Sequence, residues 1–245
     1  MLNPEINTGK NRGKKSEDNA LFSSLSQKKK LADGLKDMFY LLSKGYAAKS
    51  SLELVGNRYK LTRRQMLALQ GMSCSENALQ LRKNKELKPE ELKNQDIFID
   101  GFNFLILIES LLSEAYIFKG IDGCYRDLSS VHGTYRKVNQ TENVLVTTGK
   151  ILQELNVHKV TWIFDRPVSN SGRIKNLGYE IAQKHGYNWE IVLDNSPDKF
   201  LVHKPYNVIS SDAWVLDKCY RWFNLGAFFI KYSSLNYSEN ILNFN

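Results

Sequence analysis

Residues 97–103 read IFIDGFN, in which three apolar residues run into Asp100 and Gly101 follows at once. Two later stretches have the same design: VTWIFDRPVSNSG at residues 160–172, which reaches Asp165, and NVISSDAWVLD at residues 207–217, which reaches Asp212. In each stretch a short run of apolar, often β-branched or aromatic residues is followed by an aspartate. This pattern is typical of buried strands that end at a polar edge of a sheet.

More strands and helices are predicted around these three stretches. Short apolar runs also lie at residues 189–193 and 227–230, and helix-like stretches lie at residues 104–115, 141–155, 172–185 and 212–223. Strands that are apolar on both faces and alternate with helices predict a parallel sheet covered by helices on both sides. We therefore predict an α/β, Rossmann-like domain over residues 96–245.

The first 95 residues differ in character from the rest. Residues 1–30 are rich in Lys, Asn, Ser and Gly, which predicts a mobile, disordered basic tail. Apolar residues at helical spacing predict a module of three short helices over residues 31–72, with a capping box from Thr62 to Gln65. Residues 73–95 combine many Lys and Glu with few large apolar side chains, and we interpret them as a charged helical linker.

The charge of the chain is unevenly distributed. Its 245 residues include 34 Lys and Arg against 26 Asp and Glu, a net charge of +8, and 42% are apolar, which excludes a disordered chain. The net charge is +4 over residues 1–30, +5 over residues 31–95 and −1 over residues 96–245. The basic N-terminal part therefore suggests a nucleic-acid partner, whereas the C-terminal part is close to neutral.

Cysteine and histidine usage excludes other classes. Cys74, Cys124 and Cys219 are isolated, and the four His form no HxH or HExxH pair, so we expect reduced thiols and no structural zinc. No secretory signal and no membrane span are visible. We therefore expect a cytoplasmic protein without a membrane partner; the sequence specifies no oligomeric state.

The three aspartates suggest a metal site. In an open parallel sheet the ligand crevice lies outside the carboxyl ends of the strands, so Asp100, Asp165 and Asp212 should converge at one edge. Mg²⁺ and Mn²⁺ take oxygen ligands, often one or two carboxylates with waters and phosphate oxygens. Taken singly, however, an aspartate after a strand is more often a helix N-cap or a turn residue.

The segment after Asp165 suggests a phosphate site. Ser169, Asn170 and Ser171 lie in a loop that runs into a predicted helix start, and Arg173 follows within its first turn. Free amides and the helix dipole favour an anion there, although a plain capping loop would have the same residues. Asn103 could likewise bind a phosphate or serve as a turn residue.

Other acidic residues are weaker candidates for the metal site. Glu109 interrupts the apolar stretch FLILIES and would be costly to bury unpaired, which suggests a carboxylate near the metal. Asp122 and Asp217 stand four residues before Arg126 and Arg221, a spacing more typical of solvated ion pairs. Asp127 carries no further signal.

The order IDGFN, then FDxPVSNSG, then SSDxxxLD is similar to the pattern of PIN-like and NYN-type nuclease domains. The whole chain resembles an uncharacterised family of archaea and bacteria, the domain of unknown function 434, through GYxxKSSLELVGNRYxLTRRQ, DGCYRD and DRPVSNSGR. The resemblance implies a PIN-like fold in which strand-end acids bind Mg²⁺ or Mn²⁺ and cleave RNA. Carried over by residue, it makes Asp100, Asp165 and Asp212 the metal carboxylates, with Asn103 and Asp217 nearby. The acidic residue expected on a middle helix has no clear counterpart unless Glu109 or Asp122 supplies it.

These observations lead to two functional hypotheses. The first is a metal-dependent phosphodiesterase of the ribonuclease type, with Asp100, Asp165 and Asp212 at its centre. In it, basic residues of the helical module hold the RNA backbone: Lys49, Arg58, Lys60, Arg63 and Arg64. A solvated face would carry the same cations. The alternative is a non-catalytic nucleic-acid-binding or regulatory protein on a PIN-like scaffold.

Overall fold

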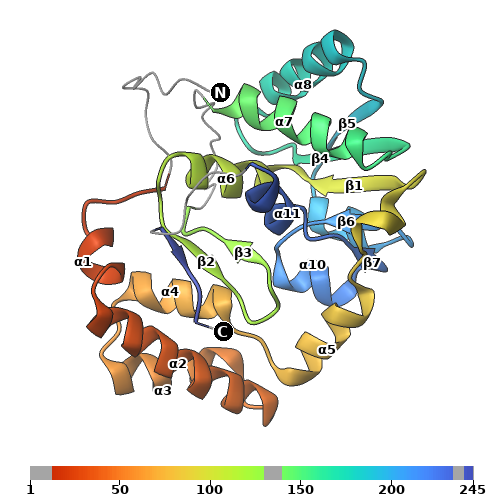
Figure 1. Ribbon diagram of the computed structural model, residues 1–245. Coiled ribbons are helices and arrows are strands. Elements are labelled where there is room, and N and C mark those ends of the chain that lie inside the picture. Colours follow the sequence, from red (N-terminus) through yellow and green to blue (C-terminus); the bar gives the residue numbers. More distant parts are fainter. Residues whose placement is uncertain (1–12, 130–139, 234–239, 245) are drawn as a thin grey trace.

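A five-stranded parallel sheet forms the centre of the C-terminal part of the chain (Figure 1). The computed structural model describes residues 13–129, 140–233 and 240–244. The sheet has the order β5–β4–β1–β6–β7, and every neighbouring pair is parallel. Its strands are β1 (Asp96–Asp100), β4 (Lys159–Asp165), β5 (Trp189–Asp194), β6 (Asn207–Ile209) and β7 (Arg221–Trp222). The predicted α/β class is confirmed.

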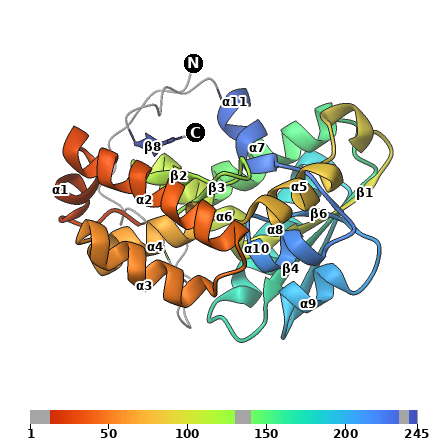
Figure 2. The same ribbon diagram turned by 90° about the horizontal axis from the view of Figure 1, so that it is seen from below.

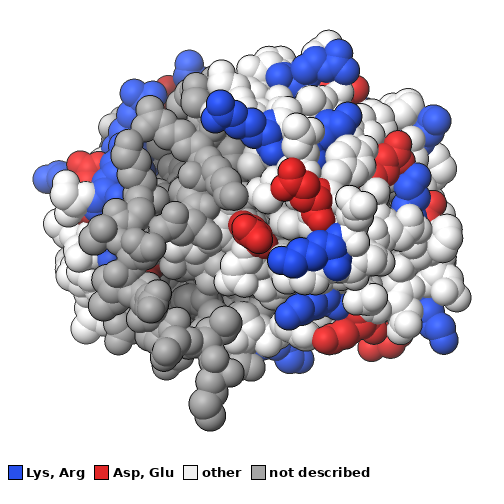
Figure 3. Space-filling view, turned by 90° about the horizontal axis from the view of Figure 1, so that it is seen from above, with Lys and Arg blue, Asp and Glu red and all other residues white. Residues whose placement is uncertain are grey.

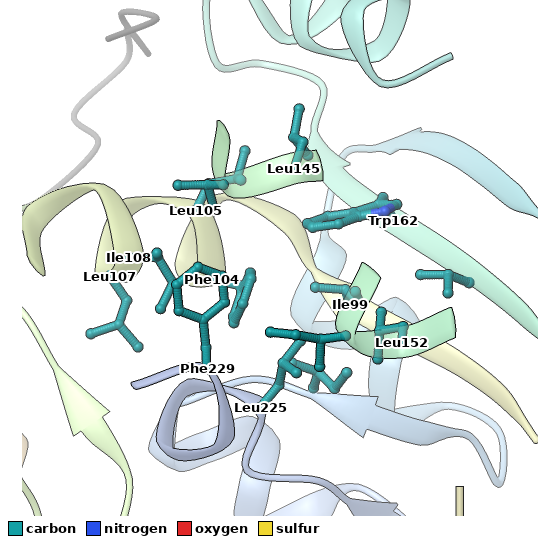
Figure 4. Close-up of a cluster of buried hydrophobic side chains, with 14 of the residues drawn as sticks. Ile99, Phe104, Leu105, Leu107, Ile108, Leu145, Leu152, Trp162, Leu225 and Phe229 are labelled. Atoms are coloured by element: carbon teal, nitrogen blue, oxygen red, sulfur yellow. The ribbon is translucent and has the colours of Figure 1, made fainter. Parts of the chain in front are cut away.

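Helices cover both faces of this sheet, because successive strand residues point to opposite faces and most are apolar. One face carries α6 (Gly101–Leu112), α7 (Thr141–Glu154), α8 (Ser171–His185) and α11 (Leu225–Tyr232). Ile99 and Trp162 pack against Phe104, Leu152 and Leu225 there (Figure 4). The other face packs on α9 (Pro197–Val202) and α10 (Ala213–Lys218).

A second, smaller sheet joins the two parts of the chain. It has the order β3–β2–β8, with β2 (Ile117–Lys119), β3 (Tyr125–Arg126) and β8 (Ile241–Leu242). Phe118 and Leu242 are buried in the same cluster as Phe22 and Leu31 of the N-terminal helices. The helical module therefore packs directly against the β-hairpin, as the view from below also shows (Figure 2).

The helical module contains α2 (Leu25–Ser43), α3 (Ala48–Tyr59) and α4 (Arg63–Met72), so the three predicted helices are confirmed. Thr62 and Gln65 form the predicted capping box at the start of α4. The prediction of a mobile tail over residues 1–30 is wrong for its second half, since α1 (Asp18–Phe22) and the start of α2 are ordered helices. Phe22 is fully buried, and this burial stabilises the segment. Residues 1–12 lie outside the described part.

The predicted linker is a packed part of the structure. It forms α5 (Glu76–Lys85) and the short helix η1 (Pro89–Leu92). Helix α5 lies against α10, and Arg82 in α5 is 3% exposed. The packing of this segment could not be predicted from the sequence, because α5 buries an arginine rather than an apolar face.

Two predicted elements near the C-terminal end are corrected. The run at residues 227–230 is part of helix α11 rather than a strand, because a short apolar run fits either element. The stretch predicted as one helix over residues 212–223 divides into α10 and strand β7. None of the described helices combines the length and apolarity that crossing a membrane requires.

Gly101 is required by close packing at the end of β1. A Cβ atom at this position would lie 2.3 Å from Cε1 of Phe164 and 2.8 Å from the carbonyl oxygen of Ile163. Both are far inside van der Waals contact, and the second is rigid backbone. The residue therefore lets α6 begin directly against β4 and fixes the direction in which Asp100 leaves the strand.

Candidate functional site

The chain adds strands to the sheet first on one side of β1 and then on the other. It passes from β1 to β4 and β5 on one side and then returns to β6 and β7 on the other. The carboxyl ends of β1 and β6 therefore form a topological switch point, where open α/β sheets bind ligands. Asp100 ends β1, and residues 210–212 leave β6 beside it.

Asp100 lies in an environment that disfavours its charge. It is 5% exposed, and its Oδ2 accepts a hydrogen bond from Oγ of Ser210 at 2.8 Å. The pKa of Asp100 is raised to about 8, mainly by burial; the hydrogen bond from Ser210 opposes the rise, and the negative charges of Asp198, Asp212 and Asp165 contribute to it. A buried carboxyl thus faces three others at the carboxyl edge.

Asp165 and Asp198 share this environment. Asp165 is partly buried and Asp198 is exposed, but partial loss of hydration raises the pKa of each carboxyl above its ordinary value. The charge of Asp194 adds to the effect at Asp165, while Asp212 and Asp165 add to it at Asp198. Among the described residues, none of these carboxylates forms a salt bridge with Lys, Arg or His.

Asp198 is a further acid at this edge that was not predicted from the sequence. It lies in α9, which begins with Pro197 in the stretch DNSPDKF directly after β5. The signal was available: a proline at the first helical position followed by an acid marks a helix start after a strand. Such a helix start lies at the same carboxyl edge as the other aspartates.

Asp212 and Asn103 both have structural partners. Oδ1 of Asp212 accepts a hydrogen bond from the backbone N–H of Val215 at 3.0 Å, so this aspartate is the N-cap of α10, the alternative role considered for it. Oδ1 of Asn103 accepts from both the N–H and the Oγ of Ser211 at 2.9 Å. Asn103 therefore holds the loop after β6 against the start of α6.

The donor set fits a hard cation only in part. All the carboxylates are oxygen donors of the kind that Mg²⁺ and Mn²⁺ prefer, and a cation would relieve their mutual repulsion. However, no three His, Cys, Asp or Glu side chains in the described ranges are arranged to hold one ion. The geometry is compatible with one or two carboxylates and water, the usual coordination of Mg²⁺.

The residues of the predicted phosphate loop have different environments in the structure. Ser171 is buried and its Oγ donates to the carbonyl oxygen of Arg166 at 3.2 Å, so it serves the turn. Asn170 precedes α8 in the left-handed conformation, with φ of 71°, and its side chain makes no capping bond. Ser169 and Arg173 are exposed beside Asp165. The exposed pair remains available to a phosphate group.

Asp122 belongs to a buried ion network instead of the carboxyl edge. Its two oxygens accept from Arg126 at 2.9 and 2.7 Å and from Nη1 of Arg82. Burial alone would raise the pKa of Asp122, but Arg126 and Arg82 hold it below its ordinary value. The predicted pairing with Arg126 is confirmed, but the pair is buried, because α5 packs its Arg82 against this turn of the β2–β3 hairpin.

The remaining weak candidates also have other partners. Asp217 bonds Nε of Arg82 at 2.7 Å, so the predicted pair with Arg221 is wrong; Arg221 instead pairs with Glu91. Glu109 is fully buried in α6 and accepts a hydrogen bond from Thr141 at the start of α7. Asp127 accepts from the N–H of Ser129 in its own loop. None of these three is among the charges that raise the pKa of Asp100.

The cations of the helical module are mostly exposed. Arg64 is the exception: it is buried in a salt bridge with Asp18, so its predicted contact with nucleic acid is wrong. Lys49, Arg58, Lys60 and Arg63 are exposed. On the face shown in Figure 3, basic and acidic side chains are interspersed wherever described residues are visible.

Comparison with known proteins identifies relatives of both parts of the chain. The family described as domain of unknown function DUF5616 matches residues 89–228, and the family described as protein of unknown function DUF434 matches residues 30–85. An uncharacterized protein of Methanocaldococcus jannaschii is 33% identical over 181 residues, which cover 74% of this chain and 86% of that protein. No solved structure matches the chain significantly. The resemblance to the DUF434 family is thus confirmed, while no match names a PIN-like nuclease.

Proposed function

The chain belongs to the family described as domain of unknown function DUF5616, and we propose that it is a metal-dependent phosphodiesterase with a PIN-like fold that cleaves RNA. One observation carries the proposal. Asp100 is a buried carboxyl at the topological switch point, the negative charges of three further carboxylates act on it, and none of the four has a Lys or Arg partner in a salt bridge among the described residues. Such an arrangement costs stability and is typical of sites that bind a cation.

The residues at this edge would have different roles in such a reaction. One or two of the carboxylates of Asp100, Asp165 and Asp212 would hold Mg²⁺ or Mn²⁺ together with water, and Asp198 adds negative charge to the site. When bound, such an ion would activate water and would stabilise negative charge on the phosphoryl group. Exposed Ser169 and Arg173 bind a phosphate of the strand, and Asn103 keeps the loop that carries Asp212 in place.

A second candidate is a non-catalytic nucleic-acid-binding protein on the same scaffold. It is favoured by the N-cap role of Asp212 and by the lack of a three-carboxylate ligand group among the described residues. Both candidates give a protein that binds RNA. Only the first gives cleavage that requires the carboxyl edge and a divalent cation.

Cleavage of labelled single-stranded RNA with and without Mn²⁺ tests the proposal. We expect cleavage by the wild type only with metal, and a loss of about 100-fold or more in Asp212→Asn. Asn caps a helix as well as Asp does, so this variant keeps α10 and removes the charge alone. Asp33→Asn in α2, which lies in the separate helical module, is the matched control.

The variants distinguish the two candidates. Asp165→Asn and Asp198→Asn are expected to lose activity in the same assay, whereas Asp33→Asn should behave as the wild type. If the wild type binds RNA but leaves it intact at every metal concentration, the second candidate is correct. Equal cleavage by Asp212→Asn and the wild type would remove the carboxyl edge from the mechanism.

A further inference from the structure

A groove lies on the outer side of the hairpin formed by α2 and α3, within the helical module. It has a volume of about 290 Å³ and is lined by Asp37, Tyr40, Leu41, Leu54, Val55 and Arg58. Tyr40 and Leu54 are both 61% exposed, which is unusual for large side chains that sit side by side. The groove is therefore open to solvent and mostly apolar.

Cations lie close to aromatic rings in and near this groove. Nζ of Lys44 lies 5.7 Å from the centre of the Tyr40 ring, and the Arg58 guanidinium lies 5.6 Å from the Tyr59 ring. Tyr46, at the tip of the hairpin, is also largely exposed. Exposed aromatic faces between cations are the arrangement with which proteins stack and hold single-stranded nucleic acid.

The charge of the module favours a polyanion as the occupant. Residues 25–72 carry ten Lys and Arg against three Asp and Glu, a net charge of +7. Of the ten cations only Arg64 is buried. Arg58 lies 3.4 Å from Asp37 but stays 69% exposed, so it can still meet a phosphate.

We propose that the α2–α3 hairpin binds single-stranded RNA, with bases stacked on Tyr40 and Tyr46 and phosphates held by Lys44, Lys49 and Arg58. The inference rests on the proposed function in naming RNA as the ligand. It assigns to the helical module the capture of the strand, separate from the carboxyl edge. The groove accepts a base because Tyr40, Leu41, Leu54 and Val55 line it. Arg58 in its lining and Lys44 beside the Tyr40 ring meet the backbone.

Fluorescence anisotropy with a labelled single-stranded RNA tests this surface. The Asp100→Asn protein without metal is used as the background, so that cleavage cannot interfere. Replacing Tyr40 and Tyr46 together by Ala is expected to weaken binding at least tenfold, since stacking on one ring contributes about 1–3 kcal/mol. Replacing both by Phe should retain binding within about twofold, because Phe preserves the stacking face.

Two matched variants separate stacking from charge. Tyr220→Ala removes a similarly exposed tyrosine, 58% exposed, outside the module and should leave binding unchanged. Replacing Lys44 and Lys49 by Gln should lower the slope of log affinity against log salt by about 1.4, the value for two phosphate contacts with a single strand.

The outcomes also separate this proposal from the proposed function. Unchanged affinity in the Tyr40 and Tyr46 double alanine variant would overturn it, as would equal competition by an acidic peptide, which has charge but no bases to stack. If the tyrosine variants lose binding while the wild type never cleaves, the surface is confirmed and the nuclease function fails. If the wild type cleaves RNA and the tyrosine changes alter neither cleavage nor binding, the nuclease function stands and the proposed RNA-binding surface fails.

Discussion

Asp100→Asn is expected to raise the melting temperature of the metal-free protein at pH 8 and to leave it nearly unchanged near pH 4. The carboxyl has a pKa of about 8 in the folded protein against 3.8 for the free side chain. Between these values the folded chain holds a proton that the unfolded chain has lost. The stability of the wild type therefore falls as pH rises through this range, by up to about 1.4 kcal/mol per pH unit.

The asparagine variant lacks this penalty, which amounts to several kcal/mol at pH 8 or above. Its amide oxygen can still accept the hydrogen bond from Ser210 that Asp100 accepts in the wild type. Thermal melts from pH 4 to pH 8.5 in a chelator measure the difference, with Asp33→Asn as the control. A difference in melting temperature that does not grow with pH would show that Asp100 is not held in its neutral form.

Divalent cations should reverse this order of stability at pH 8. A bound cation favours the ionised carboxylate, so Mn²⁺ should raise the melting temperature of the wild type and have little effect on Asp100→Asn. Equal stabilisation of both proteins would place the metal elsewhere. This measurement does not depend on any enzymatic activity.

Asp122→Ala is expected to destabilise the protein by about 3–5 kcal/mol. Its carboxylate is buried between Arg82 and Arg126, and its loss leaves two buried guanidinium groups without their shared partner. Urea unfolding measures the change. The exposed pair of Arg221 and Glu91 is the matched control, and Glu91→Ala should destabilise the protein far less, because ion pairs at the solvent surface contribute little.

The same network should influence the carboxyl edge. Nε of Arg126 donates to the carbonyl oxygen of Ser211 at 2.8 Å, and Ser211 also bonds Asn103. Loss of Asp122 therefore frees the loop that carries Asp212, and RNA cleavage should fall in the fraction that remains folded. An Asp122→Ala protein as stable as the wild type would contradict the structural role assigned to the network.

Local pattern was sufficient for most of the fold. The apolar runs that end at Asp100 and Asp165 are parallel strands, as predicted, and the capping box from Thr62 to Gln65 begins a helix. Both features could be predicted because each signal lies within a few neighbouring residues. The strand predicted at residues 227–230 was wrong, because four apolar residues do not distinguish a buried helix from a strand.

The candidate site was less accessible to sequence reasoning, since its contacts join distant residues. Arg82 reaches Asp122 and Asp217 across 40 and 135 positions, so the sequence near Asp122 indicated its pairing with Arg126 but not its second partner or its burial. Arg64 was assigned to nucleic acid because it looks like an exposed cation on a helix, yet it meets Asp18, which lies 46 residues away. Of the four acids at the carboxyl edge, Asp100, Asp165 and Asp212 were visible as strand ends, whereas Asp198 required recognition of a short helix start.

Anomalous diffraction from crystals soaked in Mn²⁺ tests the central claim most directly. The carboxyl edge is expected to show a peak within coordination distance of Asp100 or its neighbours Asp165, Asp198 and Asp212, and crystals of Asp100→Asn should lose it. A peak absent from this edge in the wild type, or present with equal height in the variant, would contradict the assignment of these carboxylates to a divalent cation.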